Sequence, residues 1–90
     1  MPGDLPTDVR SVLTQLFATA RSALDAGDVE TAREAVGSAE TVVTTKLPEG
    51  DRRDRLAHGC ERVETLLADE PDTAGAAAYL AAMEARLPDT

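Results

Sequence analysis

His58 and Cys60 are the residues whose types come nearest to catalytic or metal-binding chemistry, because imidazole and thiolate groups serve as bases, nucleophiles and zinc ligands. A structural zinc site takes four ligands, whereas this sequence holds one His and one Cys in all. Positions two apart on a helix also point in different directions. We therefore expect Cys60 in the core and His58 in solvent, with no metal, no cofactor, no catalytic residue and no enzymatic activity.

Carboxylate pairs such as Glu30 with Glu34, or Glu61 with Glu64, are the next candidates for chemistry. Acid–base catalysis needs two carboxyl groups in one cleft with separated pKa values. The sequence carries 17 Asp and Glu residues in 90 positions, so pairs at this spacing arise by chance. We interpret them as solvated helix faces.

Arg52, Arg53 and Arg55 form a basic cluster at the expected start of a helix. Cations at a helix N-terminus oppose the helix dipole, and Asp51 and Asp54 can offset them locally. The alternative is that the cluster docks an acidic partner or a phosphorylated ligand, because the guanidinium fork matches carboxylate and phosphate. These three arginines are therefore candidate partner-binding residues.

Four helical segments must position these residues, at about 7–26, 29–46, 51–68 and 73–87 of one domain, 1–90. Gly27 suits a left-handed helix cap, Asp28 suits an N-cap, and Pro48 and Pro71 interrupt the helical pattern. Short connections make sequential helices neighbours. The pattern predicts an all-α, four-helix domain of two antiparallel helical hairpins, arranged as an up-down bundle or as stacked hairpins.

The apolar residues of these segments recur at the three- and four-residue spacing of one helix face, and they predict the core. Gly37 interrupts the second segment at a cost of about 1 kcal/mol relative to Ala, and a close helix crossing is the compensation that we expect. The predicted core consists of Val12, Leu13, Leu16, Phe17, Ala20, Leu24, Val36, Ala39, Val43, Leu56, Cys60, Val63, Leu67, Leu80, Met83 and Leu87.

The last segment is rich in alanine on all sides. One interpretation is helix propensity, since Ala is the best helix former. The other is that small side chains admit the domain's own core on one side and a partner on the other. Tyr79 beside the apolar stripe would then anchor the partner, because Tyr is enriched where one edge is buried and the hydroxyl stays wet. Tyr79, Ala78 and Ala82 are the candidate residues for this contact.

Residues 16–39 resemble one tetratricopeptide repeat, with Leu16, Ala20, Gly27, Asp28 and Ala32 at the family's apolar and turn positions. The aromatic positions of that family are absent, and several repeats are normally stacked to make a peptide-binding groove. The whole chain also resembles the short, acidic helical proteins of haloarchaea, which have no assigned activity.

The net charge of −8 limits the classes of partner that we expect and indicates the salt concentration to which the protein is adapted. Nucleic acid and anionic membranes are bound mainly through Lys and Arg, so neither is an expected partner. Excess carboxylate with Lys46 as the single lysine is typical of a salt-adapted protein, because molar salt screens surface repulsion. With no secretion signal, no membrane span and one unpaired cysteine, a cytoplasmic location is expected.

These observations favour a noncatalytic module that binds another protein or itself, the latter as a homodimer. The alternative is a regulatory protein that binds a small ligand or anion, which requires a pocket between helices.

Overall fold

The computed structural model describes residues 7–87, and residues 1–6 and 88–90 of the expected single domain lie outside the described part. Four α-helices follow one another: α1 (Thr7–Asp25), α2 (Val29–Lys46), α3 (Asp51–Leu66) and α4 (Thr73–Arg86). The all-α, four-helix prediction is confirmed. The predicted third segment, 51–68, continues two residues beyond the observed end of α3.

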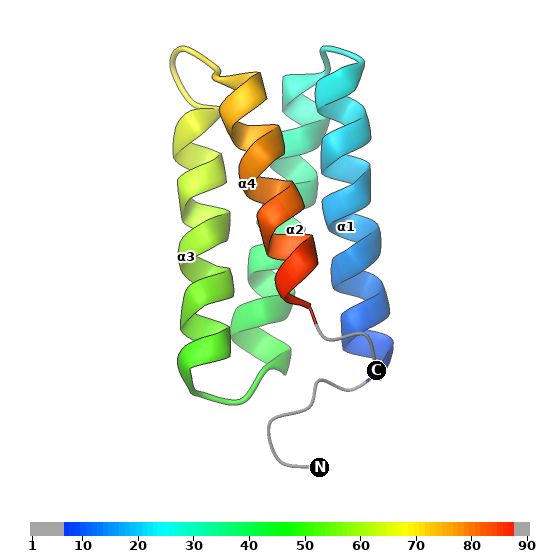
Figure 1. Cartoon of the computed structure of the whole chain (residues 1–90), viewed down its shortest axis with the longest axis vertical. Helices are drawn as coiled ribbons and strands as arrows, with labels where there is room; N and C mark the ends of the chain where they lie inside the picture. The colour runs from blue at the N-terminus through cyan, green and yellow to red at the C-terminus, as the bar shows by residue number, and fades with distance from the viewer. Residues whose placement is uncertain (1–6, 88–90) are drawn as a thin grey trace.

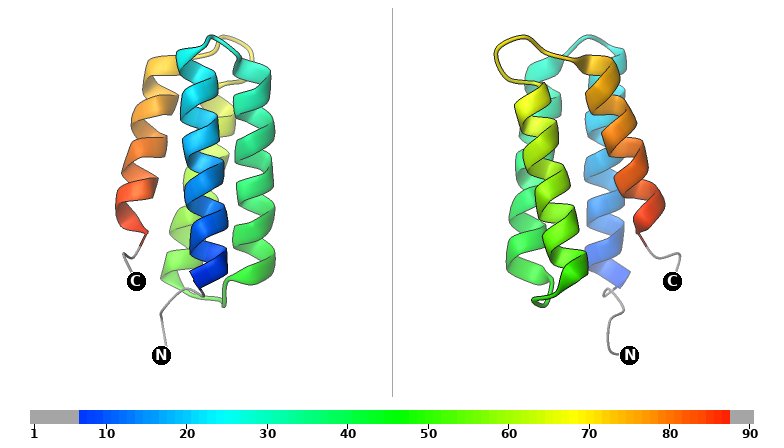
Figure 2. Two further views of the ribbon diagram at one scale, coloured as in Figure 1. Left: turned by 90° about the vertical axis from the view of Figure 1, so that its right-hand side faces the viewer. Right: turned by 60° about the vertical axis from the view of Figure 1, so that its left-hand side comes forward.

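The four helices close into a bundle, which decides between the two arrangements left open by the sequence. Each helix packs against the next along the chain, and α1 also packs against α4. Figure 1 shows α4 running diagonally between α3 and α1, and the two views in Figure 2 show the same four-sided arrangement. Stacked hairpins would leave α1 and α4 apart, so their contact identifies an up-down bundle.

Two aspartates begin helices in the same way. Asp28 accepts a hydrogen bond from the backbone N–H of Thr31, and Asp72 accepts one from the backbone N–H of Gly75. Each thereby satisfies a donor that the first helical turn leaves unpaired. Gly27, at a φ of 77°, makes the left-handed turn between α1 and α2 that the sequence predicts.

The core is apolar throughout the described residues, with no buried polar or charged side chain among them. Val12 is a correction, because 44% of this predicted core residue is exposed. Leu16 is also only partly buried. Both lie at the edge of the α1 stripe, whereas its centre is fully buried. The buried core is Val9, Leu13, Phe17, Ala20, Ala23, Leu24, Ala32, Ala35, Val36, Ala39, Val43, Leu47, Leu56, Cys60, Val63, Leu67, Ala76, Leu80, Met83 and Leu87.

The expected close crossing at Gly37 is wrong, and the bundle has one at Gly59 instead. A Cβ built on Gly37 would meet nothing within 4 Å, so its backbone is not approached by another helix. A Cβ on Gly59 would overlap the Sδ of Met83 and lie 3.1 Å from its Cγ. The missing side chain on α3 thus makes room for a side chain of α4.

Candidate functional site

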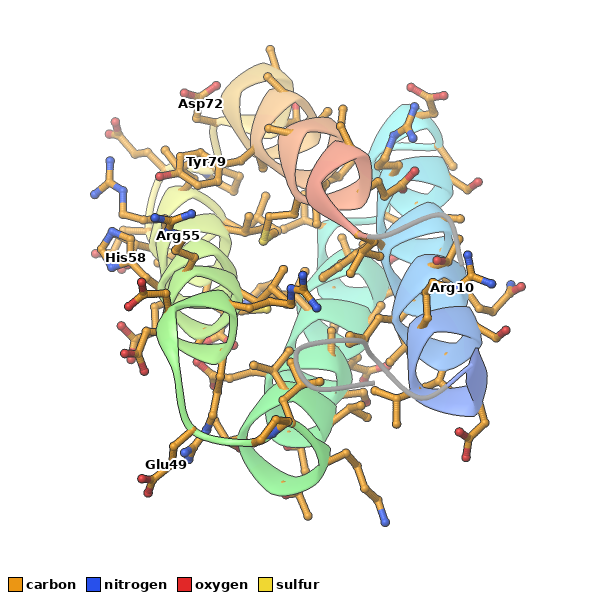
Figure 3. The ribbon with its side chains drawn as sticks, turned by 60° about the horizontal axis from the view of Figure 1, so that its bottom comes forward. Arg10, Glu49, Arg55, His58, Asp72 and Tyr79 are labelled. Carbon is orange, nitrogen blue, oxygen red and sulfur yellow. The ribbon has the colours of Figure 1, made fainter. Side chains whose placement is uncertain are left out.

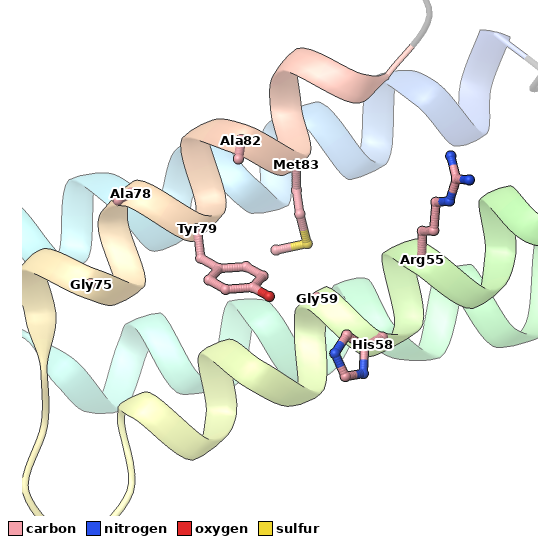
Figure 4. Close-up of a pocket in the computed structure, with 8 residues that line it drawn as sticks. All are labelled: Arg55, His58, Gly59, Gly75, Ala78, Tyr79, Ala82 and Met83. Carbon is pink, nitrogen blue, oxygen red and sulfur yellow. The ribbon is translucent and has the colours of Figure 1, made fainter.

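A groove of about 370 Å³ lies between α3 and α4, on the outside of the packed core. It opens to solvent along one side and is shown in close-up in Figure 4. Its walls are mostly small or apolar. The lining residues are Arg55, His58 and Gly59 of α3 and Gly75, Ala78, Tyr79, Ala82 and Met83 of α4.

The floor of the groove is set by the contact between Met83 and Gly59. The Met83 side chain extends from α4 to the backbone of α3 at this glycine, and it is 2% exposed. Tyr79 is half-buried one turn earlier and packs against the core, with its ring leaning toward α3 (Figure 4). A thioether and an aromatic ring therefore form an apolar surface at the bottom of an open groove.

The start of α4 shapes the upper end of the groove. Asp72 caps the helix, and its carboxylate lies against the backbone of Gly75, where a Cβ would be 2.9 Å from the carboxyl carbon. Glycine at this position lets the cap form without a side chain in the way. The exposed side chains of Ala78 and Ala82 continue the same edge, so α4 presents little more than its backbone to the groove opening.

The polar side chains that line the groove, those of Arg55, His58 and Tyr79, can each donate a hydrogen bond. Arg55 and His58 are exposed on α3, and Figure 3 shows them on the same side of the bundle as Tyr79. Among the residues that the structure describes, none of these three side chains has a hydrogen bond or ion pair. No carboxylate of the described residues 7–87 is among the side chains that line the groove, although the sequence carries 17 Asp and Glu.

The other edge of α4 is different, because a charge pair closes it. The guanidinium of Arg21 on α1 donates to a carboxylate oxygen of Glu84 on α4 at 2.9 Å. The second oxygen of Glu84 is buried and has no hydrogen-bond partner within residues 7–87. The bundle thus supplies a carboxylate to the cation at the seam of α1 and α4, whereas none within residues 7–87 pairs with Arg55 at the groove.

The structure brings four of the six candidate partner-binding residues to the groove: Tyr79, Ala78, Ala82 and Arg55. Arg52 and Arg53 do not line it. Arg53 is half-buried and lies 3.8 Å from Glu49 as a loose ion pair. The basic cluster therefore divides, and Arg55 alone of the three lines the groove. Gly59, Gly75, His58 and Met83 also line the groove, and the sequence analysis did not identify them as site residues. Gly59 was the one detectable signal, because a glycine in the inward stripe of a helix indicates a close approach by another helix.

Cys60 is an unreactive type of cysteine. Its side chain is fully buried, and burial raises the pKa of the thiol to about 12, with the negative charges of Glu40, Glu64 and Glu61 adding to the effect. A thiolate nucleophile needs the opposite environment, exposed and electropositive. Cys60 thus serves as a small core residue.

Within residues 7–87, no group of three or more His, Cys, Asp or Glu side chains is placed to hold a metal ion. None of the four described helices is both long and apolar enough to cross a membrane.

Comparison with known proteins places the chain in a family. No curated protein and no solved structure matches it. The resemblance of residues 16–39 to a tetratricopeptide repeat is not supported, since a different family matches and α1 and α2 pack into a closed bundle. The match covers residues 1–89, so the chain belongs to the family described as a domain of unknown function (DUF8101).

Proposed function

We propose that this chain is a noncatalytic interaction module that binds another protein through the face formed by α3 and α4. The observation that carries the proposal is the groove between these helices, with an apolar floor of Tyr79 and Met83 beside Arg55, a cation without an ion pair to any residue in the described range 7–87. Partly buried aromatic residues beside shallow apolar pockets are the usual anchors of protein interfaces.

The edge of α4 supports the same proposal. Ala78 and Ala82 are exposed and lie one turn apart, so another chain can approach the α4 backbone closely. Ala74, Ala81 and Ala85 are exposed as well. The sequence from Thr73 to Met83 has no charged residue, which is unusual on a chain of net charge −8, and charged residues are depleted at interface centres.

A paired substitution tests the proposal. Ala82→Phe fills the groove, whereas Ala81→Phe adds the same side chain to the same helix at an exposed position that does not line it. We expect proteins captured from a lysate of the native host by the tagged chain to be lost with Ala82→Phe and retained with Ala81→Phe. Equal capture by both variants would contradict the proposal, and so would no capture by an unsubstituted chain that is also monomeric.

Self-association is the second form of the same proposal, in which the partner is another copy of this chain. Sedimentation of the purified protein over a concentration range in high salt, with the same two variants, separates the two forms. A dimer that Ala82→Phe dissociates supports homodimerisation through this face. A monomer at all concentrations leaves the partner as a different protein.

A small-ligand or anion-binding regulator is the second candidate, favoured by the volume of the groove. About 370 Å³ lies within the range of roughly 300 to 1,000 Å³ of small-molecule sites. Such a ligand would raise the melting temperature of the chain by mass action. A screen of carboxylates and phosphates for thermal stabilisation that is absent in Ala82→Phe would establish this candidate, and a screen without such a compound would remove it.

We also propose a salt-adapted, cytoplasmic protein of the haloarchaeal type, with neither nucleic acid nor membrane as partner. The support is the charge of −8 with a single lysine. Screening over about 3 Å at 1 M salt would relieve the repulsion among these carboxylates. The melting temperature should therefore rise from dilute buffer to about 2 M KCl, a range that spans this screening regime. An unchanged melting temperature would contradict salt adaptation.

A further inference from the structure

We propose that the groove between α3 and α4 docks an acidic amphipathic helix of another protein. One large apolar side chain of that helix rests on Tyr79 and Met83, and its carboxylates pair with Arg55 and His58. This inference rests on the interaction module proposed above and specifies the chemistry of its partner.

Three side chains that line the groove can donate hydrogen bonds to a partner. The guanidinium of Arg55, the imidazole of His58 and the hydroxyl of Tyr79 line one groove and are not engaged by any residue in the described range 7–87. A partner that supplies lysines would place cation against cation at Arg55. A partner that supplies carboxylates would instead gain charge-assisted hydrogen bonds at Arg55.

Two other arginines of the chain have carboxylate partners close by. At the seam of α1 and α4, Arg21 has Glu84 at 2.9 Å, and the start of α3 has Arg53 near Glu49. Within residues 7–87, by contrast, no carboxylate lines the groove or pairs with Arg55. The net charge of −8 acts over longer distances, and at about 0.1 M salt it is screened beyond roughly 10 Å. Close contacts therefore decide which partner the groove accepts.

The shape favours a helix over a free small molecule. The groove is open to solvent along one side, whereas small-molecule sites bury roughly 70 to 90% of their ligand. Ala78 and Ala82, one turn apart on α4, leave space for a helix backbone to lie along the opening. An apolar side chain from such a helix reaches the floor formed by Met83, which is the arrangement of helix-in-groove recognition.

Three synthetic peptides test the charge of the partner. Each is an amidated helix of about 20 residues, long enough to be helical alone, with Leu on one face. The positions that flank the Leu face carry Glu in the first peptide, Gln in the second and Lys in the third. The remaining positions are Ala. Amide NMR signals of the isotope-labelled protein are followed during titration at about 0.1 M salt, where local charges still act.

We expect the Glu peptide to bind most tightly and to shift the signals of residues 55–59 and 75–83. Arg55→Gln should raise the dissociation constant about two- to fivefold, the range of a partly exposed ion pair. Lys46→Gln removes the same charge from α2, which does not line the groove, and should leave the constant unchanged. Ala82→Phe should abolish the shifts and Ala81→Phe should preserve them.

Different failures separate this inference from the module itself. Binding of the Gln or Lys peptide in the groove as tightly as the Glu peptide overturns the acidic partner and leaves the module standing. Equally tight binding of free 3-phenylpropionate, or concentration-dependent shifts of the same signals without peptide, replaces the partner helix by a small carboxylate or by a second copy. No shift in the groove with any probe contradicts both the inference and the module.

Discussion

The two hairpins of the bundle carry one aromatic residue each and place it differently. Phe17 of the first hairpin is completely buried, whereas Tyr79 of the second is half-buried beside a groove. The alanines differ in the same way. Ala32, Ala35 and Ala39 of α2 are buried, while most alanines of α4 are exposed. The first hairpin thus buries its aromatic residue and the alanines of α2, with Val12 exposed at its edge, whereas the second leaves Tyr79 half-buried and most of the α4 alanines on an open face.

The turns of the two hairpins agree with this division. Gly27 and Asp28 reverse the chain directly between α1 and α2. The connection from α3 to α4 runs from Leu67 to Asp72, and Figure 1 shows it as a wide loop. If the proposed function holds, the first hairpin mainly stabilises the bundle and the second also binds the partner, and the following predictions test the difference in stability.

The largest expected effect is the loss of stability on truncating the aromatic residue of the first hairpin. Phe17→Ala should lower the free energy of unfolding by about 3 to 5 kcal/mol, because it leaves a cavity in the centre of the core. Tyr79→Ala should cost only about 1 to 2 kcal/mol, because its ring is half-buried. Urea unfolding followed by circular dichroism measures both, and equal losses would contradict the division between the hairpins.

The two helix glycines give the next largest contrast. Gly37→Ala should stabilise the chain by about 1 kcal/mol through helix propensity, because nothing lies near its added Cβ. Gly59→Ala should be destabilising, since displacing Met83 costs about 1 to 3 kcal/mol and offsets that gain. In a Met83→Ala background the same Gly59→Ala change should become favourable. If Gly59→Ala stabilises the unsubstituted chain, the contact with Met83 is not tight.

Helix periodicity and cap residues were sufficient to predict much of this fold. Asp28, Gly27 and Pro48 mark the ends of segments, and each acts within a few residues of itself. The exposure of Val12 was not predictable from the pattern, because an apolar residue at the edge of a stripe is buried only if a neighbouring helix reaches it. Helix propensity places Ala in α2 and α4 alike, so it does not reveal which alanines are exposed.

The groove could be predicted only in part. Tyr79 and the α4 alanines were identifiable because an aromatic residue beside an alanine-rich face is uncommon. The division of the arginines was not, since Arg53 and Arg55 differ only in the side of α3 on which they lie. The compensation expected at Gly37 occurs at Gly59, because packing depends on which glycine faces the long side chain of Met83.

The seam where the two hairpins meet should respond to pH through Glu64 on α3. Burial raises the pKa of Glu64, and the charges of Glu40 and Glu61 and a hydrogen bond with Glu40 raise it further, while Arg33 opposes them. With the folded pKa above the ordinary value of 4.5, the stabilising contribution is present below pH 4.5 and is lost as pH rises through the folded pKa.

Glu64→Gln tests this effect, because it removes the charge and nearly keeps the shape. We expect the variant to melt at a higher temperature than the unsubstituted chain at neutral pH, with the difference shrinking as pH falls toward 4.5. Glu34→Gln, at an exposed position of α2, is the control for general charge reduction. If the two variants have the same pH profile, Glu64 does not titrate as the structure indicates.

The smallest expected effect is the difference in melting temperature between variants of the two aspartate caps, Asp28 of α2 and Asp72 of α4. The hydroxyl of Thr31 donates to Asp28 at 2.7 Å, and this bond, with that from the Thr31 backbone N–H, lowers the pKa of the Asp28 carboxyl. Its contribution is therefore present above the ordinary pKa of 3.8 and is lost as pH falls through the folded value. Asp72 lacks such a hydroxyl, because Gly75 occupies the corresponding position.

Asn caps helices about as well as Asp, so Asp28→Asn and Asp72→Asn both keep a cap. At neutral pH we expect Asp28→Asn to lower the melting temperature more than Asp72→Asn, and the two variants to converge in acid; a larger loss at Asp72 would contradict this role of Thr31.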